Sequence, residues 1–157
     1  MKLAQVLQLD DSDYHVFEDT AASGEWAIPG AFAFSNWTEA ELEGKAKQAF
    51  QHGWLGLDSF GRATVVAVTS ITEAERSALI DKLAFHFCEA WGAPSVEAAM
   101  PVATEEIDHM IALCEAHPDN TLIVVERTLD DMGVREKFRL IPPKGASLDT
   151  FAVHGDY

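Results

Sequence analysis

Five stretches of the chain carry the hydrophobic patterns that are typical of β-strands. Residues 3–9 alternate between apolar and polar side chains, and residues 62–71 are β-branched on both parities, which indicates a strand covered on both faces. Asp130–Gly133 separates the last two apolar stretches and predicts a hairpin turn. We predict strands over residues 3–9, 25–34, 62–71, 121–129 and 134–141.

Helix starts are marked by two capping boxes, in which a threonine is followed three residues later by a glutamate. They are formed by Thr38 with Glu41 and by Thr72 with Glu75. Apolar residues then recur at helical spacing, and we predict helices over residues 38–52, 72–91 and 95–116. Pro101 lies inside the third of these stretches and leaves open whether it forms one kinked helix or two.

This order of elements predicts an α+β fold. The order, strand-strand-helix-strand-helix-helix-strand-strand, favours a mostly antiparallel five-stranded sheet with the helices packed on one face. The length of 157 residues is typical of one domain, which we assign to residues 1–141. Residues 142–157 follow Pro142-Pro143 as a C-terminal extension, which we expect to pack on the domain or on a neighbouring subunit.

Composition narrows the classes of partner. The chain has 26 acidic and 11 basic residues, a net charge of −15, and 48% hydrophobic residues. It is too apolar for a disordered acidic tail, and its charge repels nucleic acid and anionic membranes. We find no apolar stretch of membrane-spanning length, no secretory signal and only two cysteines, so we expect a cytoplasmic protein with no disulfide framework.

A first candidate site is a pair of potential metal ligands in the third predicted helix. Glu106 and His109 are three residues apart and therefore share a helix face. Such a pair is half of the arrangement found in di-iron carboxylate proteins, which needs a second copy and two further glutamates. The simpler interpretation is a solvated acidic face. Cys88 and Cys114 fall on apolar stripes, which indicates burial as small hydrophobic side chains.

A second candidate site is a row of cations in the last predicted strand. Arg135, Lys137 and Arg139 alternate with other residues and so lie on one strand face, and Arg127 on the preceding strand joins them if the register allows. This basic row in an otherwise acidic chain can hold a small anionic ligand such as a carboxylate or phosphate. Pairing with cross-strand acids is the alternative.

Common catalytic motifs are absent from this sequence. There is no phosphate-binding glycine loop, no dinucleotide-binding turn and no nucleophile elbow, and we predict no cofactor. The leading interpretation is an interaction or accessory protein without catalytic activity of its own, bound to a protein partner or to itself as a homo-oligomer. The alternatives are a binder of a small anionic ligand, an enzyme that uses the basic row, or a metal site at Glu106 and His109.

Several short motifs resemble a known protein family. They are Leu7-x-Leu9-Asp10-x-Ser12-Asp13-x-x-Val16-Phe17, Gly24-Glu25-Trp26-Ala27-x-x-Gly30-x-Phe32-x-Phe34, Phe50-x-x-Gly53-x-Leu55-Gly56, Gly92-Ala93-Pro94 and Leu113-Cys114. The pattern resembles a family of short, functionally uncharacterised bacterial proteins, a domain of unknown function, over residues 1–141. The resemblance implies no activity, cofactor or catalytic residue. Pro101 departs from the alanine-rich helix expected in this family.

Overall fold

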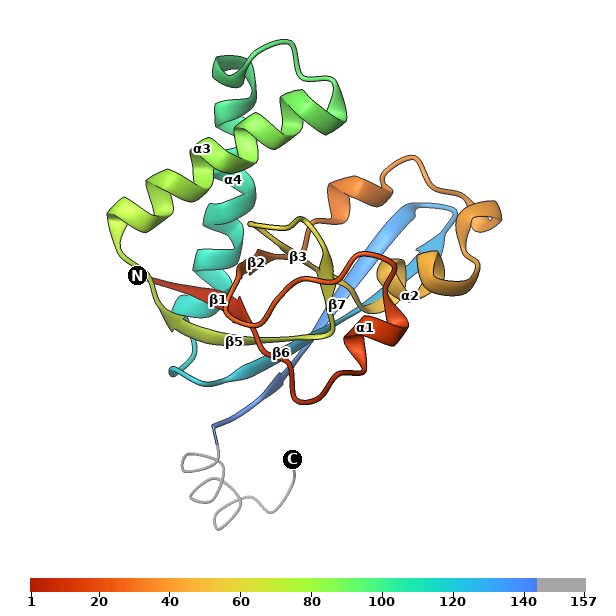
Figure 1. Cartoon of the computed structure of the whole chain (residues 1–157), viewed down its shortest axis with the longest axis horizontal. Helices are drawn as coiled ribbons and strands as arrows, with labels where there is room; N and C mark the ends of the chain where they lie inside the picture. Colours follow the sequence, from red (N-terminus) through yellow and green to blue (C-terminus); the bar gives the residue numbers. More distant parts are fainter. Residues whose placement is uncertain (144–157) are drawn as a thin grey trace.

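The sheet is antiparallel, curled and seven-stranded in the computed structural model, which describes residues 1–143 (Figure 1). Each strand pairs with its neighbours in antiparallel register. In sheet order the strands are β4 (Arg62–Ala63), β3 (Trp54–Gly56), β2 (Trp26–Ile28), β1 (Lys2–Val6), β5 (Val65–Ser70), β6 (Leu122–Asp130) and β7 (Gly133–Ile141).

The α+β class, the antiparallel sheet and the C-terminal hairpin are confirmed, whereas the expected number of five strands is wrong. The stretch predicted as one strand over 25–34 stops at Ile28, because Gly30 adopts a left-handed conformation (φ 66°) and opens a 3₁₀ turn, Ala31–Phe34. The stretch 62–71 divides at Thr64 into β4 and β5. The strand β3 is only three residues long and shows no alternation that would predict it.

Four α-helices occur among the described residues: α1 (Asp13–Val16), α2 (Gly44–His52), α3 (Glu73–Trp91) and α4 (Val96–Glu115). Both predicted capping boxes form. The box at Thr72 opens α3, but the box at Thr38 opens only a 3₁₀ turn, Glu39–Glu41. The predicted helix over 38–52 therefore begins later, at Gly44, and the short helix α1 was not predicted.

The sequence left open whether residues 95–116 form one kinked helix or two. In the structure they form the single helix α4. The Ser95 hydroxyl accepts a hydrogen bond from the Ala98 N–H and caps the helix. Pro101 lies in the second turn, where its missing N–H leaves only one carbonyl, that of Glu97, without its intrahelical partner. Helix α4 thus spans 20 residues and presents its apolar side to the sheet.

The helices cover the sheet around its central strands. Helix α4 packs against β1 and β2, α3 packs on α4, and α2 packs against β6. The sheet curls so far that the ring of Trp54 on β3 stacks on Phe138 of β7, with 5.6 Å between ring centroids, although four strands lie between them in the sheet. The curl brings the last strand close to the first half of the chain.

No helix within residues 1–143 combines the length and the apolar character needed to cross a bilayer. The expectation that the C-terminal extension packs on the domain or on another subunit concerns mainly residues 144–157, which lie outside the described residues.

Candidate functional site

A hollow of about 240 Å³ lies between α4 and β7 and is the candidate site. Three ionisable side chains line it: Glu106 and His109 from α4, and Glu136 from β7. Its other walls are mainly apolar. They are formed by Pro29, Ala31, Met110, Leu113 and Phe138. We call this cavity the α4–β7 hollow.

Helix and strand periodicity place these side chains together. Glu106, His109 and Leu113 are three and four residues apart on α4, so they follow one face of the helix. Glu136 and Phe138 are two residues apart on β7, so they lie on the same face of the strand. The hollow forms where these two faces meet beside the loop that follows β2.

Within residues 1–143, the Glu106 carboxylate makes no hydrogen bond or ion pair. The Glu106 side chain is half-buried. Burial raises the pKa of Glu106, and the negative charges of Glu136 and Glu105 add to this effect, while His109 opposes it when positively charged. The carboxylate is therefore held in a position that disfavours its ionised form.

Glu136 differs from Glu106 because its charge is neutralised. Its Oε2 lies 2.8 Å from Nε of Arg127, which faces it directly in the register of β6 and β7. The Arg127 side chain is completely buried, whereas that of Glu136 is 24% exposed. The guanidinium of Arg127 is thus buried beneath the hollow, and the carboxylate of Glu136 lies at the wall of the hollow.

The remaining donors of Arg127 bind backbone carbonyls of distant segments. Nη1 donates to the carbonyl oxygens of Phe50 and Gly53, at 3.0 and 2.8 Å, and Nη2 donates to that of Pro29. These oxygens belong to the C-terminal end of α2, to the residue before β3 and to the end of β2. Arg127 therefore joins four elements, including its own strand.

A second arginine, Arg62, is buried beside it. It donates to the carbonyl oxygens of Pro29, Gly53 and Gly30, at 3.1, 3.1 and 3.2 Å. Both guanidinium groups lie over the ring of Phe34, at 4.6 Å for Arg62 and 5.2 Å for Arg127. Burial, together with the charge of Arg127, lowers the pKa of Arg62 to about 9.

The structure brings the two predicted metal ligands, Glu106 and His109, into one cavity. It also adds Glu136, which sequence reasoning had not selected. No group of three or more histidine, cysteine, aspartate or glutamate side chains that could hold a metal ion occurs within residues 1–143. Since protein zinc sites use at least three protein ligands, the geometry adds no support to the metal hypothesis.

The predicted basic row does not form as a group of four. Register pairs Arg127 with Glu136, which places both on the face opposite Arg135, Lys137 and Arg139. Arg127 is therefore a buried structural residue, and the register of β6 and β7 keeps it out of the basic row. Arg135 pairs with Asp130, and Arg139 Nη1 lies 3.3 Å from Oε1 of Glu126. None of these three lines the α4–β7 hollow.

The sequence contains a signal for the two buried arginines, Arg62 and Arg127. Arg127 follows Ile123 and Val125 at the buried parity of β6, and Arg62 opens a run of small and β-branched residues. A charged side chain at a buried position is rare unless it is paired, so each of these arginines predicts a partner elsewhere in the chain. The identity of that partner depends on the curl of the sheet, which the pattern does not contain.

These features define an α+β protein with a curled antiparallel sheet and a small, partly acidic hollow between its last strand and its longest helix. A family model matches residues 1–157, and the chain belongs to that family, a family of unknown function named DUF6505. The predicted resemblance to a family of unknown function is confirmed, and it covers the whole chain instead of residues 1–141. No curated protein and no solved structure matches the chain.

The two cysteines differ in accessibility, which gives a direct test of the packing of α4. Cys114 is fully buried, and burial raises the pKa of its thiol to about 12, while Cys88 on α3 is partly exposed. We expect a thiol reagent at pH 8 to modify one equivalent of Cys88 in the native protein and to reach Cys114 only after unfolding in urea. The variant Cys88→Ser should lose the fast phase, and equal rates at both thiols would contradict the packing.

Proposed function

We propose that this protein binds a small organic cation, an amine or a guanidinium compound with a short apolar body, in the α4–β7 hollow. The observation that carries the proposal is Glu106, a half-buried carboxylate with no hydrogen-bond or ion-pair partner among residues 1–143. An ammonium or guanidinium group placed against it forms a charge-assisted hydrogen bond and offsets the cost of burying the charge.

The surroundings of Glu106 favour a cation over an anion. Glu136 is a second carboxylate on the wall, and the guanidinium that neutralises it has its donors directed to Glu136 and to backbone carbonyls. The net charge of −15 also raises the concentration of cations at the protein surface. The alternative of an anionic ligand rests on Arg135, Lys137 and Arg139, which do not line this hollow.

The size of the hollow limits the ligand. A volume of about 240 Å³ is below the range of roughly 300–1,000 Å³ that is typical of sites for drug-sized molecules. Met110, Leu113 and Phe138 offer apolar contacts beside the carboxylate. The proposed ligand therefore has one cationic group and an apolar part no larger than about a butyl chain or one aromatic ring.

Titration of n-butylamine and benzylamine into isotopically labelled protein, followed by NMR, tests the proposal. We expect shifts of amide resonances in α4 and β7, and we expect no such shifts with n-butanol or butyrate.

Glu106→Gln should weaken binding about 10- to 100-fold, because a hydrogen bond to a charged group contributes roughly 1.5–3 kcal/mol. The matched control is Glu105→Gln, on the exposed side of the same helix turn, which should bind like the unmodified protein. Equal binding by Glu106→Gln, or stronger binding of butyrate, refutes the proposal.

The affinity for the amine is expected to depend on pH. Because the pKa of Glu106 is raised by burial, lowering the pH protonates this carboxyl before ordinary glutamates and removes the charge that holds the cation. Binding of n-butylamine should therefore weaken as the pH falls from 7 towards 5. Glu106→Gln should lose this dependence, and a pH profile that is unchanged by the substitution would argue against a role for this carboxyl.

A further inference from the structure

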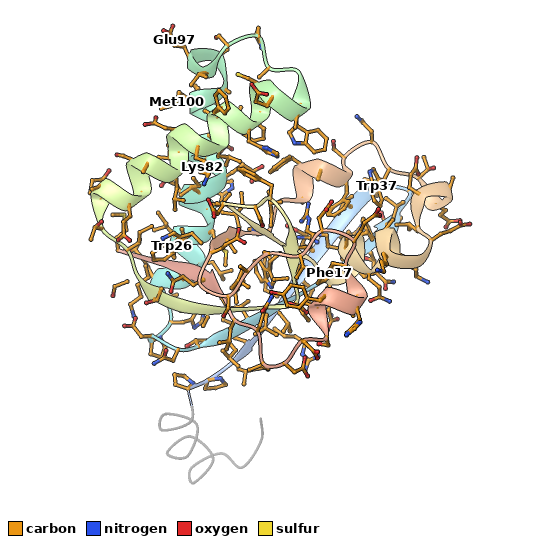
Figure 2. The ribbon with its side chains drawn as sticks, viewed as in Figure 1. Phe17, Trp26, Trp37, Lys82, Glu97 and Met100 are labelled. Atoms are coloured by element: carbon orange, nitrogen blue, oxygen red, sulfur yellow. The ribbon has the colours of Figure 1, made fainter. Side chains whose placement is uncertain are left out.

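Helices α3 and α4 form a hairpin whose far end projects from the sheet, away from the α4–β7 hollow (Figure 1). We call residues 85–102 the α3–α4 tip: the last turns of α3, the connection around Gly92, and the first turns of α4. In Figure 2 the side chain of Glu97 marks the outer end of this tip, with Met100 closer to the body of the molecule. The tip is thus placed to reach a partner without obstruction by the sheet.

Apolar side chains at the tip surround a shallow depression of about 210 Å³. The side chain of Trp91 is 49% exposed and that of Val102 is 50% exposed, although both are apolar. The other side chains at the depression include Phe87, Pro94, Ala98 and Ala99. Exposed apolar surface gathered around a depression is typical of a surface that binds another protein segment.

Trp91 is held in place before any partner arrives. Its ring makes an edge-to-face contact with Phe32, with 5.7 Å between centroids, and its Nε1 donates to Nε2 of His86 at 3.3 Å. His86 in turn stacks on Phe60, at 3.7 Å between ring centroids. A tryptophan fixed in this way loses little freedom on binding, and tryptophan is enriched among the residues that contribute most to protein interfaces.

The charge around the depression has one sign. From residue 83 to residue 126 the sequence contains no lysine and no arginine, and this segment includes the distal half of α3 and all of α4. Glu89 and Glu97 flank the depression in sequence, and both are exposed. Neither glutamate lines the depression, but they are the only Asp, Glu, Lys or Arg residues within 85–102, so the tip carries negative charge alone. An apolar depression on a negatively charged tip is complementary to an apolar segment with basic flanks.

From this combination we infer that the α3–α4 tip docks a basic amphipathic protein segment, with an apolar anchor against Trp91 and Val102 and lysine or arginine side chains near Glu89 and Glu97. Helix-in-groove recognition of this kind reads apolar anchors at helical spacing. The uniform negative charge disfavours a second copy of the same tip, because two negatively charged tips would repel each other. This inference is independent of the α4–β7 hollow and of any ligand bound there.

Fluorescence anisotropy with labelled model peptides tests the inference on the full chain. The probe is an 18-residue amphipathic helix of leucine and lysine, and its counterpart has glutamate in place of every lysine. We expect saturable binding of the lysine peptide and none of the glutamate peptide, with affinity that falls as salt is raised. Trp91→Ala and Val102→Asn should each weaken binding at least about ten-fold.

The matched control is Phe85→Ala. Phe85 is a 57% exposed aromatic residue on the same helix, but it does not line the depression, so its loss should leave binding unchanged. Thermal unfolding of each variant checks that the fold is retained, and Val102→Asn keeps the test valid if Trp91→Ala unfolds.

Four results would overturn the inference. They are no binding of the lysine peptide, equal binding of both peptides, binding that neither Trp91→Ala nor Val102→Asn weakens, and a dimer in analytical ultracentrifugation that Trp91→Ala dissociates. The last result would show that a second copy occupies the tip.

Discussion

Replacing Arg127 by methionine is expected to lower the free energy of unfolding by about 3 kcal/mol, because the substitution removes the buried partner of an ion pair and a charged donor to three backbone carbonyls. The substitution leaves the Glu136 carboxylate without its counter-charge and leaves the carbonyls of Phe50, Gly53 and Pro29 with fewer donors. Methionine fills much of the same volume, so the loss would come mainly from polar groups. Urea denaturation followed by tryptophan fluorescence measures it.

Arg62→Met is the comparison that isolates the ion pair. Arg62 is also buried, but it makes no ion pair with residues 1–143, and two of its three carbonyl acceptors, Pro29 and Gly53, also accept from Arg127. Burial already opposes its charge, as the lowered pKa shows. We expect a loss of about 1 kcal/mol, mainly from the Gly30 carbonyl that loses its donor. If the two variants lose the same free energy of unfolding, the ion pair between Arg127 and Glu136 does not add to stability.

A second large effect is expected for Gly30→Ala, with a loss of about 2–5 kcal/mol from left-handed strain and overpacking together. Gly30 adopts φ 66°, and a Cβ built there lies 2.6 Å from Cβ of Leu55 and 3.2 Å from Nη1 of Arg62. The backbone would have to move away from β3, and with it the loop between Pro29 and Ala31 that lines the α4–β7 hollow. Thermal and urea unfolding measure the loss.

Gly44→Ala provides the matched control for backbone strain. Gly44 has a similar φ of 57°, but nothing lies within 4 Å of a Cβ built there. This variant should lose only the cost of a left-handed alanine, about 1–2 kcal/mol. If both glycine variants lose the same amount, the close approach between Gly30 and β3 does not hold.

The parts of the fold that sequence reasoning predicted are those fixed by local pattern. The Thr72 capping box, the apolar stripe of α3 and the left-handed Gly92 all act within one helix, so they place its ends correctly. The hairpin of β6 and β7 is predicted in the same way, because its turn is two residues long. By contrast, β3 and β4 are three and two residues long and depend on pairing with other strands.

The candidate site was predicted only in part, for a related reason. Helical spacing places Glu106 and His109 on one face, and that relation holds in the structure. Alternation along β6 also predicts that Arg127 lies on the buried face of the strand. Alternation does not predict which groups Arg127 binds. The carbonyl oxygens that it binds belong to residues 29, 50 and 53, and only the curl of the sheet brings them to β6.

The contacts of Arg127 also join segments that are far apart in the chain. Its hydrogen bond to the Pro29 carbonyl joins residues separated by 98 positions in the chain, and Lys2 reaches the carbonyl of His117 across 115 positions. Contacts with such long separations form late, since a large loop must close first. Folding of this sheet is therefore expected to be slow for a chain of its size, because the contacts that close the curl are non-local.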